Sequence, residues 1–242
     1  MSKPPVEPQT QHAESVADAK RLMRLARLGA IATLEPDTGA PLTTLVGVAS
    51  GFDGAPIFLM STLSRHTKHL MSDPRASLLL TGEPERGDPL NHPRVTLSGR
   101  IEKTQAPSAR RRYLQRNPKA RLYADFGDFA FFRLAIELVH FNGGFGRANL
   151  LGPGDILSSS EGQAALTEAE PRLIDEINAR GDDAVNRLAG RKSSGRRVWR
   201  AIGLDSDGLD LSAGARVARL QFATPAHDEA GWRARIEEAM GG

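Results

Sequence analysis

Hydrophobic and polar residues follow two different periods in the first two thirds of the chain. From Ser15 onward apolar residues recur at helical spacing and Gly29 follows them, which predicts a helix ending near that glycine. Beyond it the pattern has period two or is continuously apolar, which predicts strands separated by turn residues. The expected strands cover residues 29–34, 41–50, 56–61, 76–81, 94–103 and 134–141.

Helical segments interrupt these strands only occasionally. The spacing predicts a short helix over 65–72 and a basic helix over 106–117, and the aromatic-rich segment 123–132 is predicted as another helix. Because helices do not follow the strands regularly, a parallel sheet of the Rossmann or triose-isomerase type is disfavoured. The pattern favours a mostly antiparallel, closed sheet in which Gly99 marks an expected bulge.

The chain divides into two expected domains joined by a polar stretch. Residues 1–14 are rich in proline and polar side chains and predict a disordered tail, and residues 15–157 form the expected barrel. The composition of residues 158–166 is typical of a linker. The remainder, 167–242, is predicted as a small α+β domain with a first helix, a hairpin-based sheet and a closing amphipathic helix.

Composition limits the function classes open to the chain. Its 242 residues are 40% hydrophobic and 25% charged, as in soluble globular proteins, and apolar runs stay below the ~20 residues of a membrane span. The absence of cysteine excludes disulfides, thiolate metal sites and thiol nucleophiles. The opening residues lack the apolar core of a signal peptide, so a cytoplasmic location without a membrane partner is expected.

The stretch after the third expected strand is the strongest candidate for a binding site. It passes through a hydroxyl-rich turn into a short helix, where Ser61, Ser64 and Thr67 offer hydroxyl groups and Arg65 and Lys68 offer positive charge. Free backbone N–H groups at a helix N-terminus complete a typical phosphate site. The alternative is that the hydroxyls cap the helix and the basic side chains are solvated. The motifs of nucleoside-triphosphate and dinucleotide sites are missing, so a mononucleotide fits better.

Five segments of the chain match a known family pattern, namely residues 41–49, 61–70, 73–80, 94–100 and 143–148. Over residues 16–155 the chain thereby resembles the FMN-binding split barrels similar to pyridoxamine 5'-phosphate oxidase. The resemblance implies a fold that is mostly β with α, an antiparallel split β-barrel of the FMN-binding type followed by the small α+β domain. It also implies a homodimer with one FMN at each subunit interface.

The family's cofactor contacts can be carried over to matching positions. Thr44 and Leu45 correspond to contacts with the flavin ring. The corresponding phosphate contacts are Ser61, Arg65, His66, Thr67 and Lys68. Arg147, in the glycine-rich segment 143–148, is expected to approach the flavin or substrate across the dimer, the alternative being a surface arginine in a tight turn.

Within this superfamily the glycine-rich segment and the trailing domain most resemble the haem-utilisation branch. That branch usually carries a Met-Asn-x-Asp-His pattern in the first helix of its second domain, whereas residues 177–181 here are Ile-Asn-Ala-Arg-Gly. Haem ligation from that position is therefore excluded. The Arg-Leu-x-Pro ending typical of pyridoxamine-phosphate oxidases is also missing, which argues against their substrate.

Other sites have weaker support. His66 and His69 are spaced to share a metal, but the nearby sequence offers no suitable third ligand, so no metal is expected. Basic residues gather at 110–121 and 191–197, yet nucleic-acid signatures are missing and aromatic residues are few, so no nucleic-acid partner is expected. The segment 205–208 resembles the start of a calcium loop but is better explained as a hairpin turn.

Three functions remain open at this stage. The first is an FMN-dependent oxidoreductase acting on a small-molecule substrate; no catalytic acid or base is assigned, because the cofactor supplies the redox chemistry. The second is a non-catalytic protein that binds FMN, haem or another tetrapyrrole. The third is a domain that has kept the fold and lost its ligand.

Overall fold

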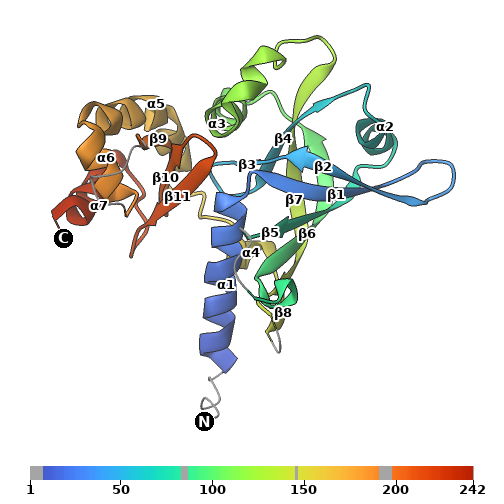
Figure 1. Cartoon of the computed structure of the whole chain (residues 1–242), viewed down its shortest axis with the longest axis horizontal. Coiled ribbons are helices and arrows are strands. Elements are labelled where there is room, and N and C mark those ends of the chain that lie inside the picture. Colours follow the sequence, from blue (N-terminus) through green and yellow to red (C-terminus); the bar gives the residue numbers. More distant parts are fainter. Residues whose placement is uncertain (1–7, 83–86, 145–146, 191–197, 242) are drawn as a thin grey trace.

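The molecule consists of a curled β-sheet, a long first helix and a smaller C-terminal α+β unit (Figure 1). The computed structural model describes residues 8–82, 87–144, 147–190 and 198–241. Helix α1 (Pro8–Leu25) contacts strands of the curled sheet and also strand β11 (Arg216–Gln221) of the C-terminal unit. It therefore lies between the two parts of the chain.

Eight antiparallel strands form the split barrel. Along the sheet their order is β2-β1-β5-β6-β7-β4-β3, and β8 also pairs with β7. Their bounds are β1 (Leu28–Leu34), β2 (Pro41–Gly47), β3 (Ala49–Ser50), β4 (Pro56–Ser61), β5 (Arg75–Thr81), β6 (Arg94–Lys103), β7 (Phe129–Asn142) and β8 (Ala148–Leu151). The predicted fold class, an antiparallel split barrel followed by an α+β domain, is confirmed.

Strand β7 is the longest of the described strands and pairs with three other strands of the barrel. Its first half pairs with β4, its last residues pair with β8, and β6 runs along its other edge. The register of β6 on β7 shifts between Ser98 and Gly99, which confirms the expected bulge. A Cβ at Gly99 would lie 2.0 Å from the carbonyl oxygen of Ala135, so only glycine fits there.

The prediction of a helix over residues 123–132 is wrong. A 3₁₀ turn covers Pro118–Leu122, and β7 begins at Phe129. Aromatic residues pack well on a pleated surface, and here they fill the sheet position between β4 and β6. The local pattern of this segment is ambiguous, and its pairing with β4 and β6 determines where it forms a strand.

The beginning of the chain also differs from the prediction. Helix α1 begins at Pro8, so residues 8–14 of the expected tail are helical, whereas residues 1–7 lie outside the described part. Ser15 stands inside the helix and its hydroxyl donates to the Gln11 carbonyl oxygen at 2.9 Å. Gly29 does not cap α1; it lies in β1, because its missing Cβ leaves room for Leu78 and Leu80.

Two larger hydrophobic cores and a smaller cluster around Tyr113 and Leu59 support this architecture. The barrel core lies under α1 and contains the fully buried Ile31, Leu97 and Leu134. Helices α2 (Arg65–Ser72), α3 (Pro107–Arg116) and α4 (Pro153–Ile156) connect the strands around it. The second core contains Trp232 and Leu173 and belongs mainly to the C-terminal unit.

The C-terminal unit packs helices on one three-stranded sheet. Helix α5 (Gln163–Ala179) begins within the expected linker, and the short helix α6 (Asp182–Leu188) was not predicted. Strands β9 (Arg200–Asp205) and β10 (Gly208–Ala213) meet at the expected hairpin turn, and β11 completes the sheet. Helix α7 (Glu229–Gly241) follows. The basic segment 191–197 lies outside the described residues.

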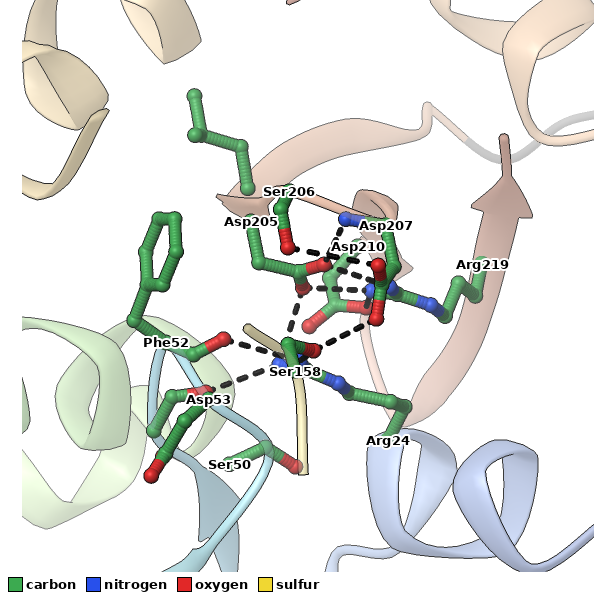
Figure 2. Close-up of polar contacts among 12 residues, drawn as sticks. Arg24, Ser50, Phe52, Asp53, Ser158, Asp205, Ser206, Asp207, Asp210 and Arg219 are labelled. Atoms are coloured by element: carbon green, nitrogen blue, oxygen red, sulfur yellow. Dashed lines mark hydrogen bonds and ion pairs between the residues drawn. The ribbon is translucent and has the colours of Figure 1, made fainter. Parts of the chain in front are cut away.

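A buried ion-pair cluster joins α1, α3 and the sheet of the C-terminal unit. Arg24 reaches from α1 to Asp205 at 2.9 Å, and Arg219 approaches the same carboxylate at 2.8 Å (Figure 2). Arg116 of α3 and Arg219 both pair with Asp210, at 3.0 and 2.9 Å. Arg112 pairs with Glu170 of α5 at 2.7 Å, and the partly buried Arg111 pairs with the same carboxylate at 2.5 Å.

The charges in this cluster depend on one another. Burial alone would raise the pKa of Asp205, but Arg219 and Arg24 outweigh it and hold that pKa below its usual range. Burial lowers the pKa of the Arg24 guanidinium, and Asp205 offsets part of that effect. Removing one member therefore leaves an uncompensated charge inside the protein.

Asp205→Asn is expected to destabilise the protein by about 3–5 kcal/mol, because Arg24 and Arg219 would remain buried without their shared carboxylate. The measurement is the free energy of unfolding in urea. Asp125→Asn is the matched control, since Asp125 pairs with Arg110 at the exposed surface and should change stability by less than about 1 kcal/mol. Equal effects of the two substitutions would contradict this assignment.

Candidate functional site

A cavity of about 800 Å³ opens between the barrel and the C-terminal unit. Its wall combines the ends of β1 and β2, the end of β4, one face of α3 with the following 3₁₀ turn, and the turn between β10 and β11. Ligand pockets in proteins span roughly 300–1,000 Å³. The cavity is therefore large enough for a cofactor-sized molecule.

Aromatic side chains form one wall of the cavity. Tyr113 of α3 packs edge-on against Phe131 with ring centroids 5.8 Å apart, and Tyr123 packs against Phe129 at 4.9 Å. The Tyr113 hydroxyl lies over Gly47, where a Cβ would approach it to 2.5 Å. Burial raises the pKa of Tyr113 to about 12, so its hydroxyl stays protonated at neutral pH and can donate a hydrogen bond.

The imidazole of His66 faces the same cavity between two hydroxyl groups. Thr44 Oγ1 lies 3.1 Å from its Nδ1, and Ser64 Oγ lies 3.0 Å from its Nε2. Burial lowers the pKa of His66 below its ordinary value of 6.5, and nearby His69 lowers it further. The imidazole is consequently neutral at pH 7 and keeps one nitrogen lone pair.

The sequence-predicted residues divide into two groups around this geometry. Leu45, Ser61 and His66 line the cavity, and Thr44 supports His66 from behind. The Ser61 hydroxyl donates to the Asp128 carboxylate at 2.5 Å, and its oxygen accepts from the Leu63 N–H at 3.1 Å. The structure thus brings together the strand and turn positions that the family resemblance named.

The three predicted residues on the body of α2 lie elsewhere. Arg65 is 72% exposed and pairs with Glu35 at 3.0 Å. Lys68 is also exposed, and Thr67 is buried with its hydroxyl 2.8 Å from that of Ser64. None of these three lines the cavity, because successive residues of a helix point in different directions.

Arg147 lies against α1 and does not line the cavity. Its guanidinium is 3.1 Å from Asp18 and 3.8 Å from Glu14. Residues 145–146 of its glycine-rich segment lie outside the described part. An approach of Arg147 to a ligand across a dimer stays a prediction.

Several lining residues carry no sequence signal for a shared site. Arg27 lies between α1 and β1, Tyr113 lies on α3, Lys119 lies in the following 3₁₀ turn, and Gly214 and Ala215 come from the C-terminal unit. Among the described residues that line the cavity, none is acidic. The cavity therefore has a positive character that suits an anionic ligand.

The two histidines of α2 have separate environments. His69 is buried and its Nδ1 lies 3.2 Å from the Thr33 hydroxyl, whereas His66 faces the cavity. Over the described residues, His, Asp and Glu side chains form no group of three that could hold a metal ion. In the same part of the chain, every helix is too short or too polar to cross a bilayer.

Comparison with known families gives a match over the barrel. A family model described as "CREG, beta-barrel" matches residues 9–157. The haem oxygenase HOZ of the Arabidopsis thaliana chloroplast is 40% identical over 134 residues, which is 54% of this chain. The match covers 40% of the Arabidopsis protein, so this chain spans less than half of that relative.

Solved structures extend the likeness to both parts of the chain. A protein of unknown function from Agrobacterium tumefaciens, Atu2129, is 31% identical with a TM-score of 0.82, over 99% of this chain and 100% of that one. A haem-binding protein from Mycobacterium smegmatis is 25% identical with a TM-score of 0.56, over 100% of this chain and 98% of that one. The α+β unit is therefore part of the shared architecture.

The lowered pKa of His66 predicts a pH dependence of stability. Below pH 6.5 the unfolded chain binds a proton at this residue before the folded chain does, so the free energy of unfolding falls as the pH is lowered. The slope contributed by this residue is at most about 1.4 kcal/mol per pH unit. Urea unfolding between about pH 7.5 and 5.5 should show that His66→Asn removes this part of the slope.

His227→Asn is the control for that experiment, because His227 is exposed and does not line the cavity. It should leave the slope unchanged. If His66→Asn and the wild type follow the same pH profile, the neutral imidazole assigned to His66 is wrong.

Proposed function

Because the chain belongs to the CREG beta-barrel family, a split-barrel group of the pyridoxamine 5'-phosphate oxidase-like superfamily, we propose that its cavity binds haem. The observation that carries the proposal is the chemistry of the cavity: an aromatic wall, a neutral imidazole, cationic side chains and no acidic residue among the described lining. A flat, largely apolar molecule with carboxylate groups suits such a surface. The haem-related relatives at 40% and 25% identity support the same choice.

Each part of the wall has a distinct task in this proposal. Tyr113, Tyr123 and Phe129 provide the apolar face against which a planar macrocycle would pack. Arg27 and Lys119 provide positive charge for its carboxylates. Bound haem would supply the iron-centred oxygen and electron chemistry, and the protein would orient it and limit the access of water.

His66 is the side chain that we expect to ligate the iron. Imidazole and phenolate are both known haem ligands, but a phenolate requires deprotonation. The raised pKa of Tyr113 opposes that deprotonation, whereas the lowered pKa of His66 keeps its imidazole neutral. Nε2 contacts Ser64 Oγ at 3.0 Å, so ligation would require this contact to open. With the ring proton on Nδ1 and donated to Thr44, the Nε2 lone pair would then be available to the iron in a fixed orientation.

FMN is the second candidate, and the hydroxyl-lined end of the cavity favours it. Ser61, Ser64 and His66 meet there beside the start of α2, as a phosphate site would require. Against this candidate, Arg65 pairs with Glu35 and neither Arg65 nor Lys68 lines the cavity. Arg65 and Lys68, the two charged residues of the phosphate site expected from the sequence, therefore do not face the cavity of their own chain.

Hemin added to the purified protein should change the Soret band in a saturable way, with one equivalent bound per chain. His66→Ala should weaken hemin binding by about tenfold or more and shift the band, because the iron loses its protein ligand. His227→Ala, which removes an exposed imidazole, should bind hemin as the wild type does. Binding of FMN, followed by quenching of its fluorescence, with no hemin binding would reject haem and favour the second candidate.

A second arm of this experiment separates carrier from enzyme. A reductant added to the hemin complex in air either leaves the Soret band in place or destroys it. A stable band identifies a binding protein, and loss of the band with a tetrapyrrole product identifies haem degradation.

We also propose that two copies of the chain pair through the open face of the barrel sheet. One row across six strands contains Leu45, Ala30, Leu79, Thr96, His140 and Leu150 in register. Leu45 and Leu150 are each 70% exposed, and no residue of this row is acidic, lysine or arginine. A sheet face in water normally carries polar side chains, so this face suits a self-complementary partner.

The cavity is continuous with this face, since Leu45 belongs to both. A second copy on the face would cover the open side of the cavity. Dimer formation and ligand binding are therefore expected to be coupled.

Leu79→Glu is expected to convert the dimer to a monomer and to weaken hemin binding, because it places a carboxylate near the centre of a row that has no acidic residue, lysine or arginine. Leu122→Glu is the matched control, as Leu122 is exposed on the 3₁₀ turn away from the row. Sedimentation velocity measures the oligomeric state of both variants. A wild-type protein that sediments as a monomer would contradict the proposed pairing.

A further inference from the structure

Arg27 stands at the cationic end of the cavity, where the C-terminal unit meets the barrel. It follows α1, and its Nη1 donates to the carbonyl oxygen of Ala215 at 2.8 Å. Ala215 lies in the turn between β10 and β11, and both residues line the cavity. The C-terminal unit thus holds the guanidinium at the cavity wall.

Among the described residues, the guanidinium of Arg27 differs from the other arginines at this junction in having no carboxylate partner. Arg24, Arg116 and Arg219 each pair with a carboxylate. Within the described residues Arg27 forms no ion pair, and its buried Nε has no hydrogen-bond partner. A buried donor without a partner destabilises the protein, and a bound acceptor group that hydrogen-bonds to this guanidinium would remove that cost.

A second cationic side chain of the cavity lining, Lys119, comes from a turn that packs beside the backbone of Arg27. The Val48 N–H donates to the carbonyl oxygen of Arg27 at 2.9 Å, and the side chain of Asn117 donates to the carbonyl oxygen of Val48 at 3.1 Å. This pair of contacts places the turn that begins at Asn117 beside Arg27. Lys119 belongs to that turn and lines the cavity.

The surroundings strengthen the positive potential at this end. Behind the wall, four buried arginines meet three buried carboxylates in the ion-pair cluster. Burial lowers the pKa of Arg116, Asp210 offsets part of this, and the charges of Arg219 and Arg27 lower it further. No acidic residue among the described lining compensates these charges.

We infer that Arg27 and Lys119 form a subsite that binds a carboxylate of the ligand, with Arg27 positioned by Ala215 of the C-terminal unit. This inference rests on the proposed haem binding, because haem carries two carboxylates on one edge of a planar ring. The subsite lies apart from the end where Thr44 holds His66, since the strand from Thr44 to Gly47 runs between them. The C-terminal unit therefore takes part in choosing an anionic ligand.

The test compares hemin with its dimethyl ester, in which both carboxylates are neutral. The wild type should bind hemin about tenfold or more tightly than the ester, because charge-assisted hydrogen bonds are lost with the ester. Arg27→Met should reduce this preference several-fold, by weakening hemin binding and leaving ester binding unchanged. The measurement is the dissociation constant from Soret titration.

Two further variants complete the design. Arg121→Met removes an exposed positive charge that does not line the cavity, and it should keep the wild-type preference for hemin. Lys119→Met changes an exposed side chain, so the fold should survive even if Arg27→Met does not fold, and it should reduce the preference. If both Arg27→Met and Lys119→Met keep the wild-type preference for hemin over the ester, the proposed subsite is wrong.

The outcomes also separate the two proposals. If the wild type binds hemin and the ester equally well, haem binding stands and the carboxylate subsite is rejected. If the wild type binds neither compound, haem binding and the subsite are both rejected.

Discussion

The buried pairing of Arg24 with Asp205 is the interaction on which the rest of the structure depends. It ties the end of α1 to the C-terminal sheet, while Arg116 ties the end of α3 to Asp210 of the same sheet. Arg27 follows three residues after Arg24, and the turn that carries Lys119 follows Arg116 directly. The contacts that hold the two parts of the chain together therefore also place the cationic end of the cavity.

The polar groups that line the cavity differ between its two ends. Neutral Tyr113 and His66 lie where a planar ring would bind, and the basic Arg27 and Lys119 lie where an anionic group would bind. Burial keeps the Tyr113 phenol protonated and the His66 imidazole neutral at pH 7. At the other end, the basic side chains of Arg27 and Lys119 line the cavity, where no described lining residue is acidic. This separation of character along one cavity is what makes a planar anion with an apolar face the ligand class that fits.

The sequence predicts the bounds of an element correctly where a strong hydrophobic pattern is flanked by clear turn residues. Strand β4, helix α2 and strand β6 have the expected bounds, and the bulge at Gly99 was expected from its glycine. The prediction failed at residues 123–132 and at the start of α1, where the local signal was weak or admitted two readings. Of the residues that the sequence proposes for the site, Leu45, Ser61 and His66 line the cavity, whereas Arg65, Lys68 and Thr67 on α2 do not.

The sequence by itself determined the fold class, the family and the strand and turn that carry Thr44 and His66, because these features are local and their patterns repeat over many residues. Only the tertiary structure decided which side chains share a cavity. Arg27, Tyr113 and Ala215 are separated by about a hundred residues from one to the next. They come together because α1, α3 and the β10–β11 turn pack around buried charges. This long-range packing cannot be predicted from the spacing of residues along the chain.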